Sequence, residues 1–178
     1  MNSFETPRLK LVPFHEDFTA EIFKLHSNPL VHKYLQNNMI SSFQEAEEIV
    51  QGVIQQYHLY QMGRYLVFEK STSDFMGWCG LKFNTHEING YKNYHDIGYR
   101  FLPQFWNKGY AFESAQFFVQ LGYSHYQLPQ IFATAECENI ASVKILKKCG
   151  LSIVETFDFH HKPTFWFEGQ NPSKEIKK

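Results

Sequence analysis

Apolar and polar residues follow two spacings along the chain. Alternation with a period of two predicts strands at 8–14, 64–70, 75–83, 96–101 and 131–137, with a closing pair at 153–159 and 164–167. Apolar residues spaced three and four apart predict helices after Asp17, from Ser42 to Gly63, after Gly109 and after Asn139. Strands and helices mixed along one chain predict a single α/β domain of the mixed α+β kind.

The stretch from Asp96 to Tyr123 suggests an anion-binding turn. A strand-like run stops at Pro103, a short loop carries Asn107, Lys108 and Gly109, and a helical pattern follows. The first N–H groups of a helix have no internal partner, and glycine lets a ligand approach the backbone closely. Walker and dinucleotide patterns are absent, so an ordinary strand-to-helix turn is an equally good interpretation of this stretch by itself.

Composition narrows the possible classes of protein. The chain has 178 residues, of which 43% are hydrophobic, and we expect one domain over 1–168 with a polar, disordered tail over 169–178. A net charge of −1 argues against a nucleic-acid binder. Three unpatterned cysteines, no signal peptide and no long apolar run predict a cytoplasmic protein without a membrane partner. The nine histidines lack ligand spacing, so we expect no metal.

Two blocks of sequence resemble a known family. One block reads D-I-G-Y-x-x-x-P-x-x-W-x-K-G-Y-A-x-E over 96–113, and the other reads E-N-x-x-S-x-x-x-L-x-x-x-G-L over 138–151. Their order and separation resemble the GNAT superfamily of acetyl-CoA-dependent N-acetyltransferases, in its RimJ/RimL-like branch, over residues 5–168. The resemblance implies a twisted mixed sheet with helices on both faces.

The resemblance also implies a site. Strands 94–102 and 130–138 would splay apart, and the pantetheine arm of acetyl-CoA, the cosubstrate, would pair with Phe101 and Leu102. Its pyrophosphate would lie on the N–H groups of Asn107, Lys108, Gly109, Tyr110 and Ala111. Asn139 would bond the pantetheine, and Ser142 would lie near the thioester sulfur. The alternative is that Asn139 only caps a helix and Ser142 is only a small helical residue.

Acetyl transfer to an amine needs a group that removes the amine proton and a group that protonates the leaving thiolate. Ser142 is our candidate for the thiolate. For the base we consider Asp96, His160, His161 or a water molecule. Asp96 as a sheet-edge charge, and the histidines as a surface turn, are the alternatives.

We therefore predict an N-acetyltransferase that acts by direct transfer on a primary amine. The acceptor would be a protein N-terminus or a small amine such as an amino acid, polyamine or aminoglycoside, contacted by loops near 28–40, 84–93 and 158–164. A non-catalytic acyl-CoA-binding module is the main alternative, and a nucleotide-phosphate binder is a remote one. Arg100 stands where the branch often has an aromatic residue, so it either reshapes the acceptor pocket or faces solvent. A monomer and a homodimer both remain open.

Overall fold

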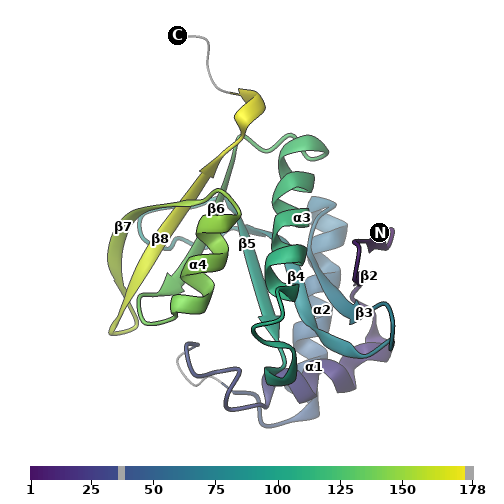
Figure 1. Ribbon diagram of the computed structural model, residues 1–178. Helices are drawn as coiled ribbons and strands as arrows, with labels where there is room; N and C mark the ends of the chain where they lie inside the picture. Colours follow the sequence, from purple (N-terminus) through teal and green to yellow (C-terminus); the bar gives the residue numbers. More distant parts are fainter. Residues whose placement is uncertain (36–38, 175–178) are drawn as a thin grey trace.

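The computed structural model describes residues 1–35 and 39–174, so residues 36–38 of the predicted acceptor loop lie outside the described residues. The described chain forms one eight-stranded sheet and four α-helices (Figure 1). The strands are β1 (Phe4–Glu5), β2 (Leu9–Pro13), β3 (Arg64–Glu69), β4 (Phe75–Asn84), β5 (Tyr94–Phe101), β6 (Gln130–Glu136), β7 (Ser152–Phe159) and β8 (Lys162–Gln170). The helices are α1 (Thr19–His26), α2 (Phe43–Tyr60), α3 (Tyr110–Ser124) and α4 (Ile140–Lys148).

The helix boundaries follow from caps that the sequence displays, with one exception. Ser42 and Glu45 form the predicted capping box at the start of α2, and the Asn139 side chain accepts the N–H of Ser142 at the start of α4. Asp17 does not cap α1, because it lies inside a short 3-10 turn over Glu16–Phe18 that precedes the helix. The helix expected after Asp17 therefore begins at Thr19, and Asp17 does not cap it.

The sheet contains one parallel junction. Its strand order is β1-β2-β3-β4-β5-β6-β8-β7, and every neighbouring pair is antiparallel except β5 and β6. These two strands pair only at Asp96 and Phe132, whereas β4 and β5 pair along their whole length. The predicted splay is therefore confirmed, and beyond the single paired position the two strands leave a gap.

Helices cover both faces of the sheet, as predicted. In Figure 1, α3 and α4 lie in front of the sheet and α1 and α2 lie behind it. Ile97 and Phe101 of β5 are buried in the main core with Phe118 of α3. The alternate residues of β5 point to the other face, where Arg100 meets His26 of α1. One strand thus presents different side chains to two helical layers.

The C-terminal part differs from the sequence-based expectation. β8 continues to Gln170, and the buried Asn171 side chain donates to the carbonyls of Tyr123 and Leu128. The ordered chain thus extends past residue 168, where we placed the boundary, as far as Lys174 among the described residues. In the part of the chain that the structure describes, no helix is long and apolar enough to span a membrane.

Candidate active site

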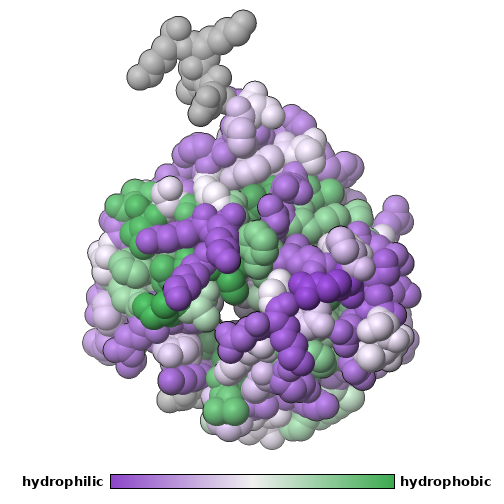
Figure 2. Space-filling model, viewed as in Figure 1, coloured by the Kyte–Doolittle hydropathy of each residue, from purple (hydrophilic) through white to green (hydrophobic). Residues whose placement is uncertain are grey.

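A cleft of about 1310 Å³ opens where β5 and β6 separate. Its walls come from β5, β6, α4, the start of α3, and the segment that links α1 to α2. Figure 2 shows the surface hollowed between α4 and the chain leading into α3. The cleft brings together most of the predicted site residues: Asp96, Phe101, Asn107, Gly109, Tyr110, Ala111, Asn139 and Ser142.

The loop before α3 has the backbone of an anion cradle. Gly109 has a φ of +82° and caps α3 without a side-chain hydrogen bond, and Asn107 also has a positive φ of 59°. Among the described residues, no backbone hydrogen bond uses the N–H groups of residues 107–111. Free N–H groups at the positive end of a 15-residue helix suit a diphosphate.

The sequence did not identify Arg8 as an anchor of this loop. The Arg8 side chain donates from Nε to Glu113 Oε2 at 2.6 Å and from Nη1 to the Lys108 carbonyl at 2.9 Å. Its guanidinium also lies 4.4 Å from the centre of the Tyr110 ring. Burial raises the pKa of Glu113, but hydrogen bonds from Thr6 and Arg8 outweigh it and leave the pKa lowered. The N-terminal segment therefore holds the cradle in place.

Ser142 and Asn139 lie at the start of α4 and face the cleft. Asn139 is a helix cap as well as a wall residue, because its Oδ1 accepts the Ser142 N–H at 3.2 Å. Tyr99 of β5 crosses the gap and donates its hydroxyl to the Ser142 carbonyl at 3.2 Å. Burial raises the pKa of Tyr99, so this hydroxyl stays protonated at neutral pH. Tyr99 thus places a second O–H group beside Ser142, at a position that the sequence pattern indicated only as part of a strand.

Asp96 lies in the cleft and is held by a buried arginine. Its Oδ1 accepts from Arg64 Nη2 at 2.7 Å, and among the described residues no hydrogen bond uses Oδ2. The Arg64 guanidinium passes over Gly98, where a Cβ would come within 2.8 Å of it. Glycine at this position therefore makes room for the pair. One carboxylate oxygen is fixed and the other is available to a ligand.

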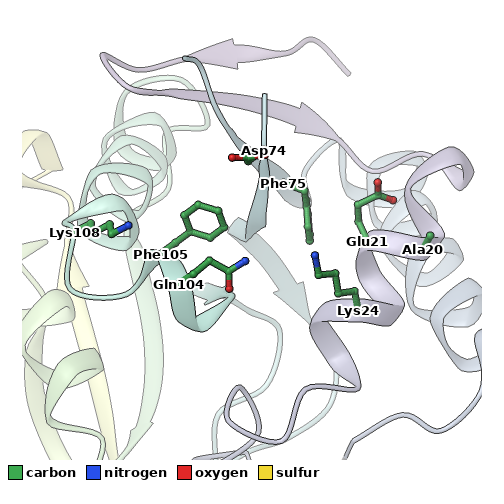
Figure 3. Close-up of a pocket in the computed structure, with 8 residues that line it drawn as sticks. All are labelled: Ala20, Glu21, Lys24, Asp74, Phe75, Gln104, Phe105 and Lys108. Atoms are coloured by element: carbon green, nitrogen blue, oxygen red, sulfur yellow. The ribbon is translucent and has the colours of Figure 1, made fainter. Parts of the chain in front are cut away.

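Three predicted groups lie elsewhere. His160 and His161 form the exposed turn between β7 and β8, both with positive φ, and neither lines the cleft. Leu102 is buried and does not line the cleft, whereas Phe101 does, which favours Phe101 as the pantetheine contact. The Lys108 side chain borders a separate hollow of about 470 Å³ between α1 and the loop (Figure 3). That hollow contains neither Asp96 nor Ser142.

Trp106 joins the loop to the end of β5. Its indole Nε1 donates to the Phe101 carbonyl at 2.7 Å, while 42% of the residue remains exposed along the cleft. This bond fixes the loop relative to the strand that would carry the pantetheine. Within the described residues, no group of three or more His, Cys, Asp or Glu is placed to hold a metal ion.

Known proteins match both the sequence and the fold. Residues 8–152 match the family profile described as "Acetyltransferase (GNAT) domain". The N-acetyltransferase p20 of Bacillus licheniformis is 28% identical over 146 residues, which is 82% of this chain and 80% of that protein.

Two solved structures share the fold. RimL, a ribosomal L7/L12 alpha-N-protein acetyltransferase in complex with coenzyme A, superposes with a TM-score of 0.76 at 18% identity, covering 95% of this chain and 98% of that one. Spermidine N-acetyltransferase from Vibrio cholerae, in complex with CoA and spermine, superposes with a TM-score of 0.75 at 18% identity. The match covers 93% of this chain and 97% of that one.

Proposed function

The chain belongs to the GNAT family of acetyltransferases, and on that premise we propose that it moves the acetyl group of acetyl-CoA directly to a primary amine. The observation that carries the proposal is the cleft itself. It joins an unpaired N–H cradle, a splayed strand pair and a serine on the opposite wall. The acceptor would be a protein N-terminus or a small amine.

Acetyl-CoA fits the features of this cleft. The N–H groups of residues 107–111 would receive the diphosphate, and the gap between β5 and β6 would admit the pantetheine arm beside Phe101. Asn139 would contact that arm from the opposite wall, while still capping α4. Lys108 would contribute its backbone N–H to the cradle, because its side chain borders the other hollow.

The transfer needs no enzyme-bound acetyl group. The amine nitrogen forms a bond to the acetyl carbonyl carbon, the carbon–sulfur bond breaks, and sulfur leaves with the electron pair as a thiolate. The thiolate gains a proton and the attacking nitrogen loses one. Ser142 would supply the proton to sulfur, with Tyr99 beside it as a second donor.

We assign removal of the amine proton to Asp96, directly or through a water molecule. A protonated amine has no lone pair with which to attack. The pKa of a free lysine amine is about 10.4, so a base is needed to deprotonate such an amine at neutral pH. Asp96 has an unused carboxylate oxygen in the cleft, whereas His160 and His161 lie on an exposed turn. The choice of Asp96 rests on this difference in position.

Thiol release tests the proposal. Purified protein is mixed with acetyl-CoA and a panel of peptides, amino acids, polyamines and aminoglycosides, and free CoA thiol is followed over time. We expect turnover with at least one acceptor, and a fall in kcat of about 100- to 10,000-fold in Ser142→Ala, because a positioned proton donor contributes a rate enhancement of this order. Ser152→Ala, at an exposed serine of β7, is the matched control.

The variants also distinguish the rival assignments. If Tyr99→Phe loses all turnover and Ser142→Ala loses none, the proton donor is Tyr99. Tight CoA binding without thiol release for every acceptor would instead support a non-catalytic acyl-CoA-binding module.

A further inference from the structure

A cluster of basic and aromatic side chains lines the same cleft as the N–H cradle. It consists of His26, His32, Trp78 and Arg100, and all four line the cleft. They come from α1, the segment after it, β4 and β5. None has a part in the transfer described above.

Arg100 is a cation that has no counter-ion in the described part of the chain. Among the described residues it makes no ion pair, and the nearby carboxylate of Asp96 is bound to Arg64. Burial lowers the pKa of Arg100 to about 10, with a smaller contribution from Arg64, so the guanidinium stays charged at neutral pH. A largely buried charge without an opposite charge is costly.

The hydrogen bonds around His26 cannot all form at once. Arg100 Nη1 lies 2.9 Å from His26 Nδ1, and Trp78 Nε1 lies 3.1 Å from His26 Nε2. Both neighbours are donors only, while a neutral imidazole has a single acceptor nitrogen. Burial, with the charge of Arg100, lowers the pKa of His26 to about 3, so the ring is neutral at pH 7. One of the two donors is therefore left without an acceptor.

His32 provides an independent sign of an incomplete site. It is only 2% exposed, yet neither of its ring nitrogens makes a hydrogen bond of good geometry among the described residues, and the His26 carbonyl is a backbone acceptor close to the ring. Its ring meets that of His26 edge-on, with 5.9 Å between centres. A neutral imidazole always carries one N–H, and burying it without a well-aligned acceptor is unfavourable.

An anionic oxygen group would resolve all three defects. It would neutralise the charge of Arg100 and accept the hydrogen bond from Arg100 Nη1, which leaves His26 Nε2 free to accept the N–H of Trp78. It would also accept an N–H from the ring of His32. Resting on the proposed acetyl transfer, we propose that the amine acceptor of this enzyme also carries a carboxylate or phosphate group, which Arg100 binds. Polyamines, which carry no anion, would then be poor acceptors.

Matched acceptors test this proposal. Glutamate and β-alanine are compared with their amides, and phosphoethanolamine with ethanolamine, by kcat/KM from thiol release. We expect the anionic member of at least one pair to be preferred about 10- to 100-fold, which is the range for a charged hydrogen bond. Arg100→Gln should bring that ratio close to one, and Arg100→Lys should restore part of it. The first two pairs report carboxylate and the third reports phosphate.

Lys10→Gln is the matched control, because Lys10 is an exposed lysine of β2 that does not line the cleft. It removes the same charge, and the ratio should stay within about twofold. Coenzyme A binding, measured by calorimetry, shows that each variant is folded. An equal preference for anionic and neutral acceptors, or an anion preference that survives Arg100→Gln, would overturn the proposal.

A binding measurement separates this inference from the proposed function. Titration of the CoA-bound protein with glutamate and with phosphoethanolamine requires no turnover. Saturable binding that is lost in Arg100→Gln, without thiol release from any acceptor, would sustain the anion site and refute the transferase. Turnover of neutral amines alone, with no anion binding, would sustain the transferase and refute the anion site.

Discussion

At the scale of single residues, His26 shows how the fold holds an ionisable group neutral. Its pKa falls from an ordinary 6.5 to about 3, first because the ring is buried and then because Arg100 lies beside it. As the pH falls below 6.5, the unfolded chain takes up a proton at this position and the folded chain does not. Stability that is present above pH 6.5 is therefore lost as the pH falls toward 3.

This sign gives a prediction for urea unfolding at pH 7 and pH 5. Between these pH values, the free energy of unfolding of the native protein should fall by about 2 kcal/mol more than that of His26→Gln. His58→Gln, at an exposed histidine of α2, should keep the native pH dependence. Equal falls in the native protein and His26→Gln would show that His26 titrates alike when folded and unfolded.

The sequence located some site residues and missed others for a physical reason. Asn139 and Ser142 lie one turn apart on one helix, so local spacing sufficed to place them together. Arg8 meets Glu113 across 105 positions of sequence, and His26 meets Arg100 across 74. No periodicity within either segment indicates such a contact. These interactions required the folded sheet.

At the scale of elements, the start of α3 depends on a distant strand. Arg8, just before β2, holds both Glu113 of the helix and the carbonyl of Lys108 in the loop. Arg8→Gln should weaken CoA binding about threefold to tenfold, because the cradle loses its anchor, while a half-exposed ion pair itself adds little stability. Calorimetric titration of CoA measures the change.

Lys10→Gln is the matched control, since it removes a charge from the exposed face of β2. Its CoA affinity should equal that of the native protein. Equal affinities for Arg8→Gln and the native protein would mean that the loop holds its shape without the arginine.

Elements with local signals were predicted well. The capping box of α2, the cap of α4 and the turn before α3 depend on neighbouring residues, and the structure contains them. β1 was missed because it has two residues, too few for an alternating pattern. The turn of the last hairpin is shorter than the gap between the expected strands, because His160 and His161 adopt the left-handed backbone and β8 begins at Lys162.

At the scale of the whole molecule, the cleft exists because two halves of a sheet meet at one residue pair. β1–β5 form one half and β6–β8 the other, joined by Asp96 and Phe132. Neither half alone contains the site, since the cradle belongs to α3 and the serine to α4. Composition and periodicity could not predict how strands this far apart in sequence meet. The family resemblance predicted that they splay apart, and the structure shows that their one paired position is parallel.

The central claim is that the N–H groups after Trp106 bind the diphosphate of coenzyme A. Amide NMR spectra of the labelled protein, recorded during titration with CoA and separately with pantetheine, test it most directly. CoA should shift the amide signals of residues 107–111 strongly, and pantetheine, which lacks the diphosphate, should leave them nearly in place. If those five signals stay unchanged at saturating CoA, the account of this site is wrong.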